Sequence, residues 1–66
     1  MNDYELENLM RAIELCFLEN YCAMTFKELY EKFLPMDYDT LLYAARALQN
    51  EGRLITEGNL IRLVVR

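Results

Sequence analysis

The sequence has no histidine, no serine and no tryptophan, and its 66 residues include only two glycines and one proline. Without histidine or serine, the chain lacks a Ser–His nucleophile pair and an imidazole that titrates near neutral pH. Two isolated glycines are also too few for a glycine-rich loop that cradles phosphate. We therefore predict that the protein is not an enzyme, with no catalytic residues and no small-molecule substrate.

Cysteine is scarce as well, with only Cys16 and Cys22 present. Two thiols supply too few ligands for a zinc site, and one pair is not the disulfide framework of a small secreted protein. Cys16 also falls on the apolar face of an expected helix, where a free cysteine packs as a small hydrophobic residue. We expect a reduced, cytoplasmic protein that binds no metal and no other cofactor.

Long apolar runs are also missing, since none approaches the roughly 18 residues of a membrane-spanning helix. The first five residues are acidic rather than basic, which is unlike a signal peptide. Hydrophobic residues nevertheless make up 55% of the chain, which is enough for one small core. We predict a single domain over residues 1–66 that does not contact a membrane.

Helical periodicity predicts three helices. The first covers residues 3–20, and a capping box from Thr25 to Glu28 opens a second helix that reaches about Phe33, before Pro35. The third helix covers about residues 37–51. Its apolar stripe has the spacing i, i+3, i+4, i+7 and consists of Leu41, Ala44, Ala45 and Leu48.

The ends of the third helix carry their own signals, Asp37 as N-cap and Gly52 as the left-handed residue that follows the helix. The run Tyr21–Met24 has the composition of a short strand. Two further runs, Leu54-Ile55 and Leu60–Val65, flank Glu57-Gly58-Asn59 and predict a hairpin over residues 53–65.

The order helix, strand, helix, helix, strand, strand, with a capping glycine and a Leu-Ile strand start after the third helix, resembles the winged helix-turn-helix DNA-binding domains. The resemblance covers nearly all of the chain. It implies a mainly α fold of α+β class, three helices with a small β-hairpin wing, in the order α-β-α-α-β-β. It also implies that helix 37–51 enters the major groove while the hairpin 53–65 contacts the DNA backbone.

The face of the third helix opposite its apolar stripe carries Tyr43, Arg46 and Asn50, which can hydrogen-bond to base edges. With Arg53 and Arg62 as phosphate contacts, these residues form the expected DNA-binding site. The sequence then predicts a small winged-helix regulator of transcription that binds DNA.

The charge balance opposes this interpretation, because 11 acidic residues outnumber 7 basic ones. Asp37 and Asp39 also place carboxylates at the helix end that usually attracts phosphate. The charge is uneven, however: residues 1–39 hold nine acids and three bases, and residues 40–66 hold two acids and four bases. The bases of the second part form one possible basic edge, made of Arg46, Arg53, Arg62 and Arg66.

A second surface is expected on the outer face of the first helix, where Tyr4, Leu15 and Leu18 lie roughly opposite its core stripe. With Leu42 at the edge of the third helix, these residues predict a homodimer or another protein partner. The alternative is that Leu18 packs under the hairpin and leaves Leu15 exposed alone. An acidic winged helix that binds proteins instead of DNA is the alternative function.

Overall fold

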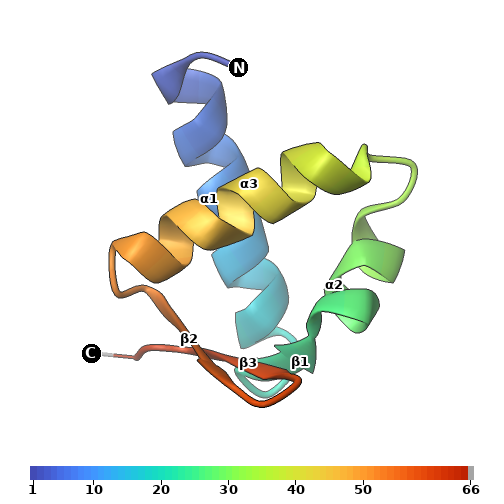
Figure 1. The fold of residues 1–66 in the computed structure, drawn as a ribbon, viewed down its shortest axis with the longest axis vertical. Coiled ribbons are helices and arrows are strands. Elements are labelled where there is room, and N and C mark those ends of the chain that lie inside the picture. The colour runs from blue at the N-terminus through green and yellow to red at the C-terminus, as the bar shows by residue number, and fades with distance from the viewer. Residues whose placement is uncertain (66) are drawn as a thin grey trace.

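The computed structural model describes residues 1–65 and contains three helices and three strands (Figure 1). In chain order they are α1 (Asp3–Leu18), β1 (Ala23–Thr25), α2 (Phe26–Phe33), α3 (Tyr38–Asn50), β2 (Leu54–Glu57) and β3 (Leu60–Leu63). The predicted order α-β-α-α-β-β and the mainly α, α+β class are confirmed. Arg66, the last residue of the expected basic edge, lies outside the described residues. Within the described part, no helix is long and apolar enough to cross a membrane.

Helix α1 ends at Leu18, two residues earlier than predicted, because the chain turns back on its last carbonyls. The Cys22 N–H donates to the Phe17 carbonyl at 2.8 Å. Tyr21 and Cys22 have φ angles of 61° and 64°, in the left-handed region that glycine usually occupies. The expected strand Tyr21–Met24 was therefore misplaced, and β1 begins at Ala23.

Local capping fixes α2 and α3 as predicted. The Thr25 side chain accepts from the Glu28 N–H at 3.1 Å, and the Glu28 carboxylate accepts from the Thr25 N–H at 3.1 Å. Asp37 accepts from the Thr40 N–H at 3.1 Å at the start of α3. These bonds satisfy N–H groups that have no partner within the first turn of a helix.

The end of α3 forms a Schellman motif around Gly52, whose φ is 72°. The Arg53 N–H donates to the Leu48 carbonyl at 2.8 Å, and the Gly52 N–H donates to the Gln49 carbonyl at 3.0 Å. No atom lies within 4 Å of the position that a Cβ on Gly52 would take. Glycine is required there for its backbone conformation and not for space.

The strands form one antiparallel sheet in the order β1-β3-β2, so the last strand is central. Met24 of β1 and Thr56 of β2 both pair with Ile61. Glu57, expected in the turn, pairs with Leu60 instead, which leaves Gly58-Asn59 as a two-residue connection with φ 61° at Gly58.

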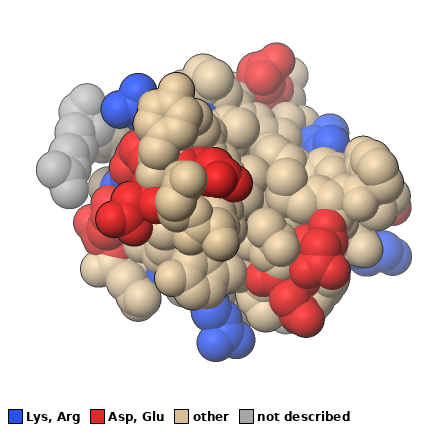
Figure 2. Space-filling view, turned by 90° about the horizontal axis from the view of Figure 1, so that it is seen from above, with Lys and Arg blue, Asp and Glu red and all other residues tan. Residues whose placement is uncertain are grey.

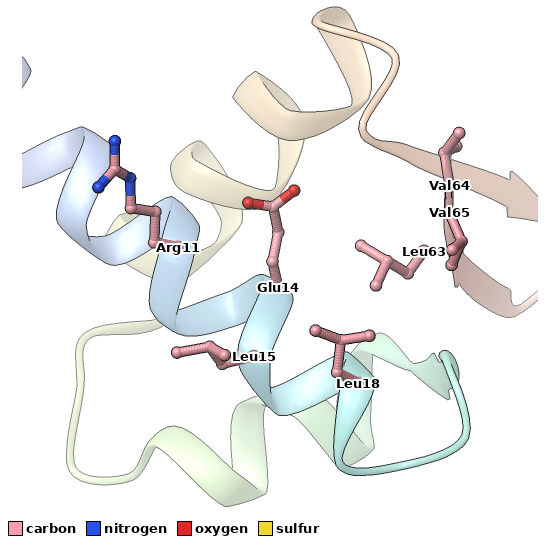
Figure 3. A pocket seen from close by; sticks show the side chains of 7 residues that line it. All are labelled: Arg11, Glu14, Leu15, Leu18, Leu63, Val64 and Val65. Atoms are coloured by element: carbon pink, nitrogen blue, oxygen red, sulfur yellow. The ribbon is translucent and has the colours of Figure 1, made fainter.

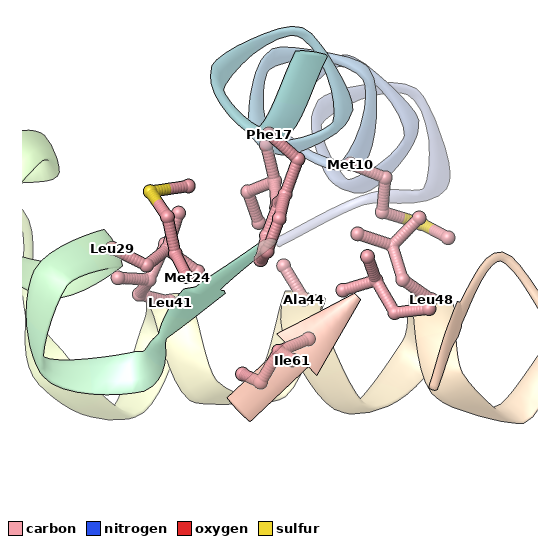
Figure 4. Packing of buried hydrophobic residues seen from close by; sticks show 10 residues of the cluster. Met10, Phe17, Met24, Leu29, Leu41, Ala44, Leu48 and Ile61 are labelled. Atoms are coloured by element: carbon pink, nitrogen blue, oxygen red, sulfur yellow. The ribbon is translucent and has the colours of Figure 1, made fainter. Parts of the chain in front are cut away.

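The core lies between α1, α3 and the sheet (Figure 4). Leu41, Ala44 and Leu48 of α3 are fully buried, which confirms the predicted stripe. The buried cluster consists of Met10, Ile13, Phe17, Met24, Leu29, Leu41, Ala44, Leu48, Leu54 and Ile61. Helix α2 buries only Leu29 fully, while its aromatic residues Phe26 and Tyr30 pack edge-on against Tyr38, each with ring centroids 5.3 Å apart.

Leu48→Ala should lower the free energy of unfolding by about 2–5 kcal/mol, because it removes a fully buried side chain and leaves a cavity. Chemical denaturation monitored by circular dichroism measures the change. Leu34→Ala is the matched control, since Leu34 is 56% exposed, and it should change stability by less than about 0.5 kcal/mol. Equal effects of the two substitutions would contradict this packing.

Gly52→Val should destabilise the domain by about 1 kcal/mol or more, because a β-branched residue is strained at a φ of 72°. Gly52→Asn should cost less, since asparagine tolerates the left-handed region. Thermal melts of the two variants give the comparison. Equal melting temperatures for Val, Asn and wild type would show that the backbone at this position is not left-handed.

Candidate nucleic-acid and protein interaction surfaces

The exposed face of α3 brings together the three residues predicted to contact base edges. Tyr43, Arg46 and Asn50 are all exposed and, with Ala47, line a shallow hollow of about 270 Å³. They lie together because positions 43, 46 and 50 follow the helical repeat opposite the buried stripe. Within residues 1–65, Arg46 forms no ion pair, so its guanidinium is available to a ligand.

The neighbouring Gln49 lies at the edge of this face. Its side-chain amide donates to the Thr56 hydroxyl, which links α3 to β2. Leu42 is half-buried on the same side of α3 and lines a separate hollow of about 310 Å³ between α3 and the hairpin. The structure therefore places Leu42 near the hairpin, away from the other residues of the predicted protein interface.

The N-terminal end of α3 is acidic. Asp37 already accepts the Thr40 N–H, and also the Thr40 hydroxyl at 3.2 Å, while Asp39 is exposed in the first turn of the helix. A carboxylate at this position occupies the positive end of the helix dipole. This end of α3 is consequently a poor site for a phosphate group.

Arg53, predicted to contact phosphate, is bound by three carboxylates of its own chain. Its guanidinium makes a bidentate pair with Glu14, with N–O distances of 2.5 and 3.1 Å. It also lies 3.2 Å from Glu7 and 3.0 Å from Glu51. The Arg53 side chain is only 23% exposed. This arrangement ties the middle of α1 to the connection between α3 and β2.

These ion pairs change the acid–base behaviour of the groups involved. The hydrogen bonds that Arg53 donates to Glu14, and then to Glu7 and Glu51, raise the pKa of Arg53 above its ordinary value. The hydrogen bond from Arg53 lowers the pKa of Glu7 below its ordinary value of 4.5. Both shifts favour the charged forms of Arg53 and Glu7.

Arg62 is paired as well, but more loosely. Its Nε lies 2.5 Å from a carboxylate oxygen of Glu57, with side chains 50% and 59% exposed. An ion pair this open to solvent contributes about 0–1 kcal/mol. Arg62 can therefore exchange Glu57 for a phosphate group at little cost, which Arg53 cannot do.

On the face shown in Figure 2, the lysines and arginines do not gather into one patch. Seen from above in Figure 2, acidic side chains form groups, while lysines and arginines are scattered around the outline of the molecule. Lys27 and Lys32 are exposed on α2, whereas Arg46 lies on α3 and Arg62 on β3. The structure thus places the predicted contacts Arg46, Arg53 and Arg62 in three different electrostatic settings.

The largest hollow described lies between α1 and the end of the chain (Figure 3). It has a volume of about 440 Å³ and is lined by Arg11, Glu14, Leu15, Leu18, Leu63, Val64 and Val65. Leu15 and Leu18 are 59% and 54% exposed, so Leu18 borders the groove without being covered by the hairpin. We call this surface the α1 groove.

The α1 groove unites two of the predicted interface residues and excludes the others. Tyr4 is 76% exposed nearer the start of α1 and does not line it. Val64 and Val65 were not predicted to take part, because their position beside α1 depends on the path of the chain after β3. Only their apolar character, at the end of the hairpin, was visible in the sequence.

The two cysteines lie close to the end of α1. Cys16 and Cys22 are both free thiols, and burial raises the pKa of Cys16, which disfavours the reactive thiolate. Residues 1–65 contain no group of three or more potential metal ligands.

Comparisons with family models, curated proteins and solved structures found no match to this chain.

Arg53→Met should reduce the free energy of unfolding by about 1 kcal/mol at pH 7. The loss is this small because the ion-pair cluster is partly open to solvent, which screens its charges. The substitution keeps the apolar stem but leaves Glu7, Glu14 and Glu51 without their shared cation. Arg62→Met is the control, and we expect a change below about 0.5 kcal/mol because that pair is exposed.

The same variant should also alter the pH dependence of stability. Because the pKa of Glu7 is lowered in the folded state, its contribution is present above pH 4.5 and is lost as the pH falls below that value. The difference in the free energy of unfolding between wild type and Arg53→Met should therefore become smaller below pH 4.5. Urea titrations at a series of pH values provide the test, and a constant difference would contradict the cluster.

Proposed function

We propose that the protein is a small cytoplasmic DNA-binding regulator of the winged helix-turn-helix type, with α3 inserted in the major groove. The observation that carries the proposal is the joint exposure of Tyr43, Arg46 and Asn50 around one hollow on α3. An α-helix fits the major groove, where base edges present distinct patterns of hydrogen-bond donors and acceptors. The helix and strand order is also that of a winged helix-turn-helix, with β2 and β3 as the wing.

The three side chains suit different contacts. The planar guanidinium of Arg46 matches the O6 and N7 acceptors of guanine, and the amide of Asn50 matches the N6 and N7 groups of adenine. The Tyr43 hydroxyl can donate to a phosphate or to a base edge. Each good bidentate pair contributes about 1–3 kcal/mol of discrimination against the wrong base.

Phosphate contacts are few in this arrangement. Arg62 is the proposed contact from the hairpin, since its ion pair with Glu57 is exposed, whereas Arg53 is held by three carboxylates and is not included. The slope of binding against salt is about 0.9 per phosphate neutralised. We therefore expect binding that depends weakly on salt and mainly on the bases that α3 contacts.

Arg46→Ala should weaken binding by about 1–3 kcal/mol to duplexes that wild type enriches from a random-sequence pool, because it removes the proposed guanine contact. Arg46→Lys is the matched variant, since it keeps the positive charge but loses the bidentate fork. It should retain non-specific binding and lose the enriched sequence. Fluorescence anisotropy at several salt concentrations measures both quantities.

Two further variants test the electrostatics of the proposal. Arg62→Ala should weaken all duplexes alike and flatten the salt dependence by about one phosphate contact. Asp39→Asn should strengthen non-specific binding, because it removes a carboxylate that repels the DNA backbone. The proposal fails if wild type does not bind mixed-sequence duplex DNA at low salt and Asp39→Asn does not create binding.

The second candidate function is a protein-interaction module. Two observations favour it, the internal ion pairs of Arg53 and Arg62 and the 62% exposure of Tyr43 beside the half-buried Leu42. Exposed aromatic side chains are enriched at protein interfaces. This function becomes the better account if the DNA-binding assays are negative.

A further inference from the structure

The α1 groove is mainly aliphatic and open to solvent. Five of its seven lining residues are leucine or valine, and Leu15, Leu18 and Val65 are each more than half exposed. Figure 3 shows Leu18 on α1 pointing toward the side on which Leu63 projects from the end of β3, while Leu15, one turn earlier, extends from the outer side of α1 away from Leu63. Adjacent exposed aliphatic side chains are typical of a surface that another molecule covers.

The charged residues beside these leucines indicate which kind of molecule covers the groove. Arg11 and Glu19 lie four residues before and four residues after Leu15, so both share its side of α1. Both are exposed, and Glu19 takes part in no ion pair within the described chain. This surface therefore carries a positive group and a negative group at equal distances from its central leucine.

Such a pattern is self-complementary under a two-fold rotation. If two α1 helices pack antiparallel around an axis at Leu15, Arg11 of each copy meets Glu19 of the other, and two ion pairs form. The small, exposed Ala12 then lies opposite Leu18 and leaves room for its side chain. A parallel arrangement would instead place like charges next to each other.

We infer that the α1 groove binds a second copy of this chain, with α1 antiparallel to α1 and the pairs Arg11–Glu19 formed in both directions. Arg11 already contacts Glu7 at 3.3 Å, but with side chains 72% and 41% exposed this pair is weak and easily exchanged. The contact is small, since it uses one helix and the end of one strand, so the dimer forms at high micromolar concentrations.

This dimer does not depend on the proposed DNA contact. The side of α1 that carries Met10, Ile13 and Phe17 is buried in the core with α3, whereas Leu15 and Leu18 lie on its other side. Dimerisation therefore leaves the exposed face of α3 free in both copies, and these two faces point away from each other. Each copy would engage its own DNA duplex, so the two proposals succeed or fail separately.

Sedimentation equilibrium between about 10 µM and 1 mM tests the inference. Wild type should dimerise, and Leu15→Glu should be monomeric because it places a charge at the centre of the contact. Ile55→Glu is the matched control, because it also adds a charge at an exposed aliphatic residue but on β2 instead of α1. This variant should dimerise like wild type. A wild type that stays monomeric at 1 mM, or a Leu15→Glu variant that still dimerises, would overturn the inference.

Charge reversal tests the orientation. Arg11→Glu and Glu19→Arg should each weaken the homodimer about tenfold or more, because each replaces two attractive pairs with two repulsive ones. A mixture of the two variants should form a heterodimer, and the double variant should regain the homodimer. Thermal melts at low concentration check that each variant is folded. Single variants that dimerise as tightly as wild type would exclude the antiparallel arrangement.

Discussion

The close contact of α3 with α1 is the constraint on which the rest of the domain depends. Ala44 is completely buried in the middle of the α3 stripe, so at this position α3 presents no side chain larger than a methyl group to the core. Leu41 and Leu48 flank it and are also completely buried. Since β2 begins only a short connection after the end of α3, the same contact influences where the sheet begins and which face of α3 meets solvent.

The parts of the structure that depend on neighbours in sequence could be predicted, and those that depend on distant residues could not. Both ends of α3 follow from Asp37 and Gly52, because each acts within a few residues of itself. The environment of Arg53 could not be foreseen, since its partners Glu7 and Glu14 lie 46 and 39 residues away. The strand predicted to begin at Tyr21 was wrong for a different reason. Tyr21 takes a left-handed backbone conformation that its residue type rarely adopts.

Helix α3 also shows a conflict between folding and binding at one residue. Asp37 starts the helix by accepting the Thr40 N–H, and the negative charge that makes it a good cap also repels phosphate. A DNA contact by α3 must therefore rest on its middle and C-terminal half, where Arg46 and Asn50 lie. The N-terminal cap and the candidate site therefore use separate parts of the same helix, so an acidic helix end is compatible with a polar exposed face further along α3.

The central place of β3 in the sheet determines the order in which the domain can be made. β3 is the last of the described strands in the chain, yet it supplies every pairing partner of both β1 and β2. A chain growing from its N-terminus thus produces α1, β1, α2 and α3 before any sheet exists to cover their apolar sides. Strand β1 must then find β3 across two intervening helices, a long loop to close. The sheet and the buried cluster are therefore complete only once residues 60–63 have been made, because β3 joins β1 to β2 and carries the buried Ile61.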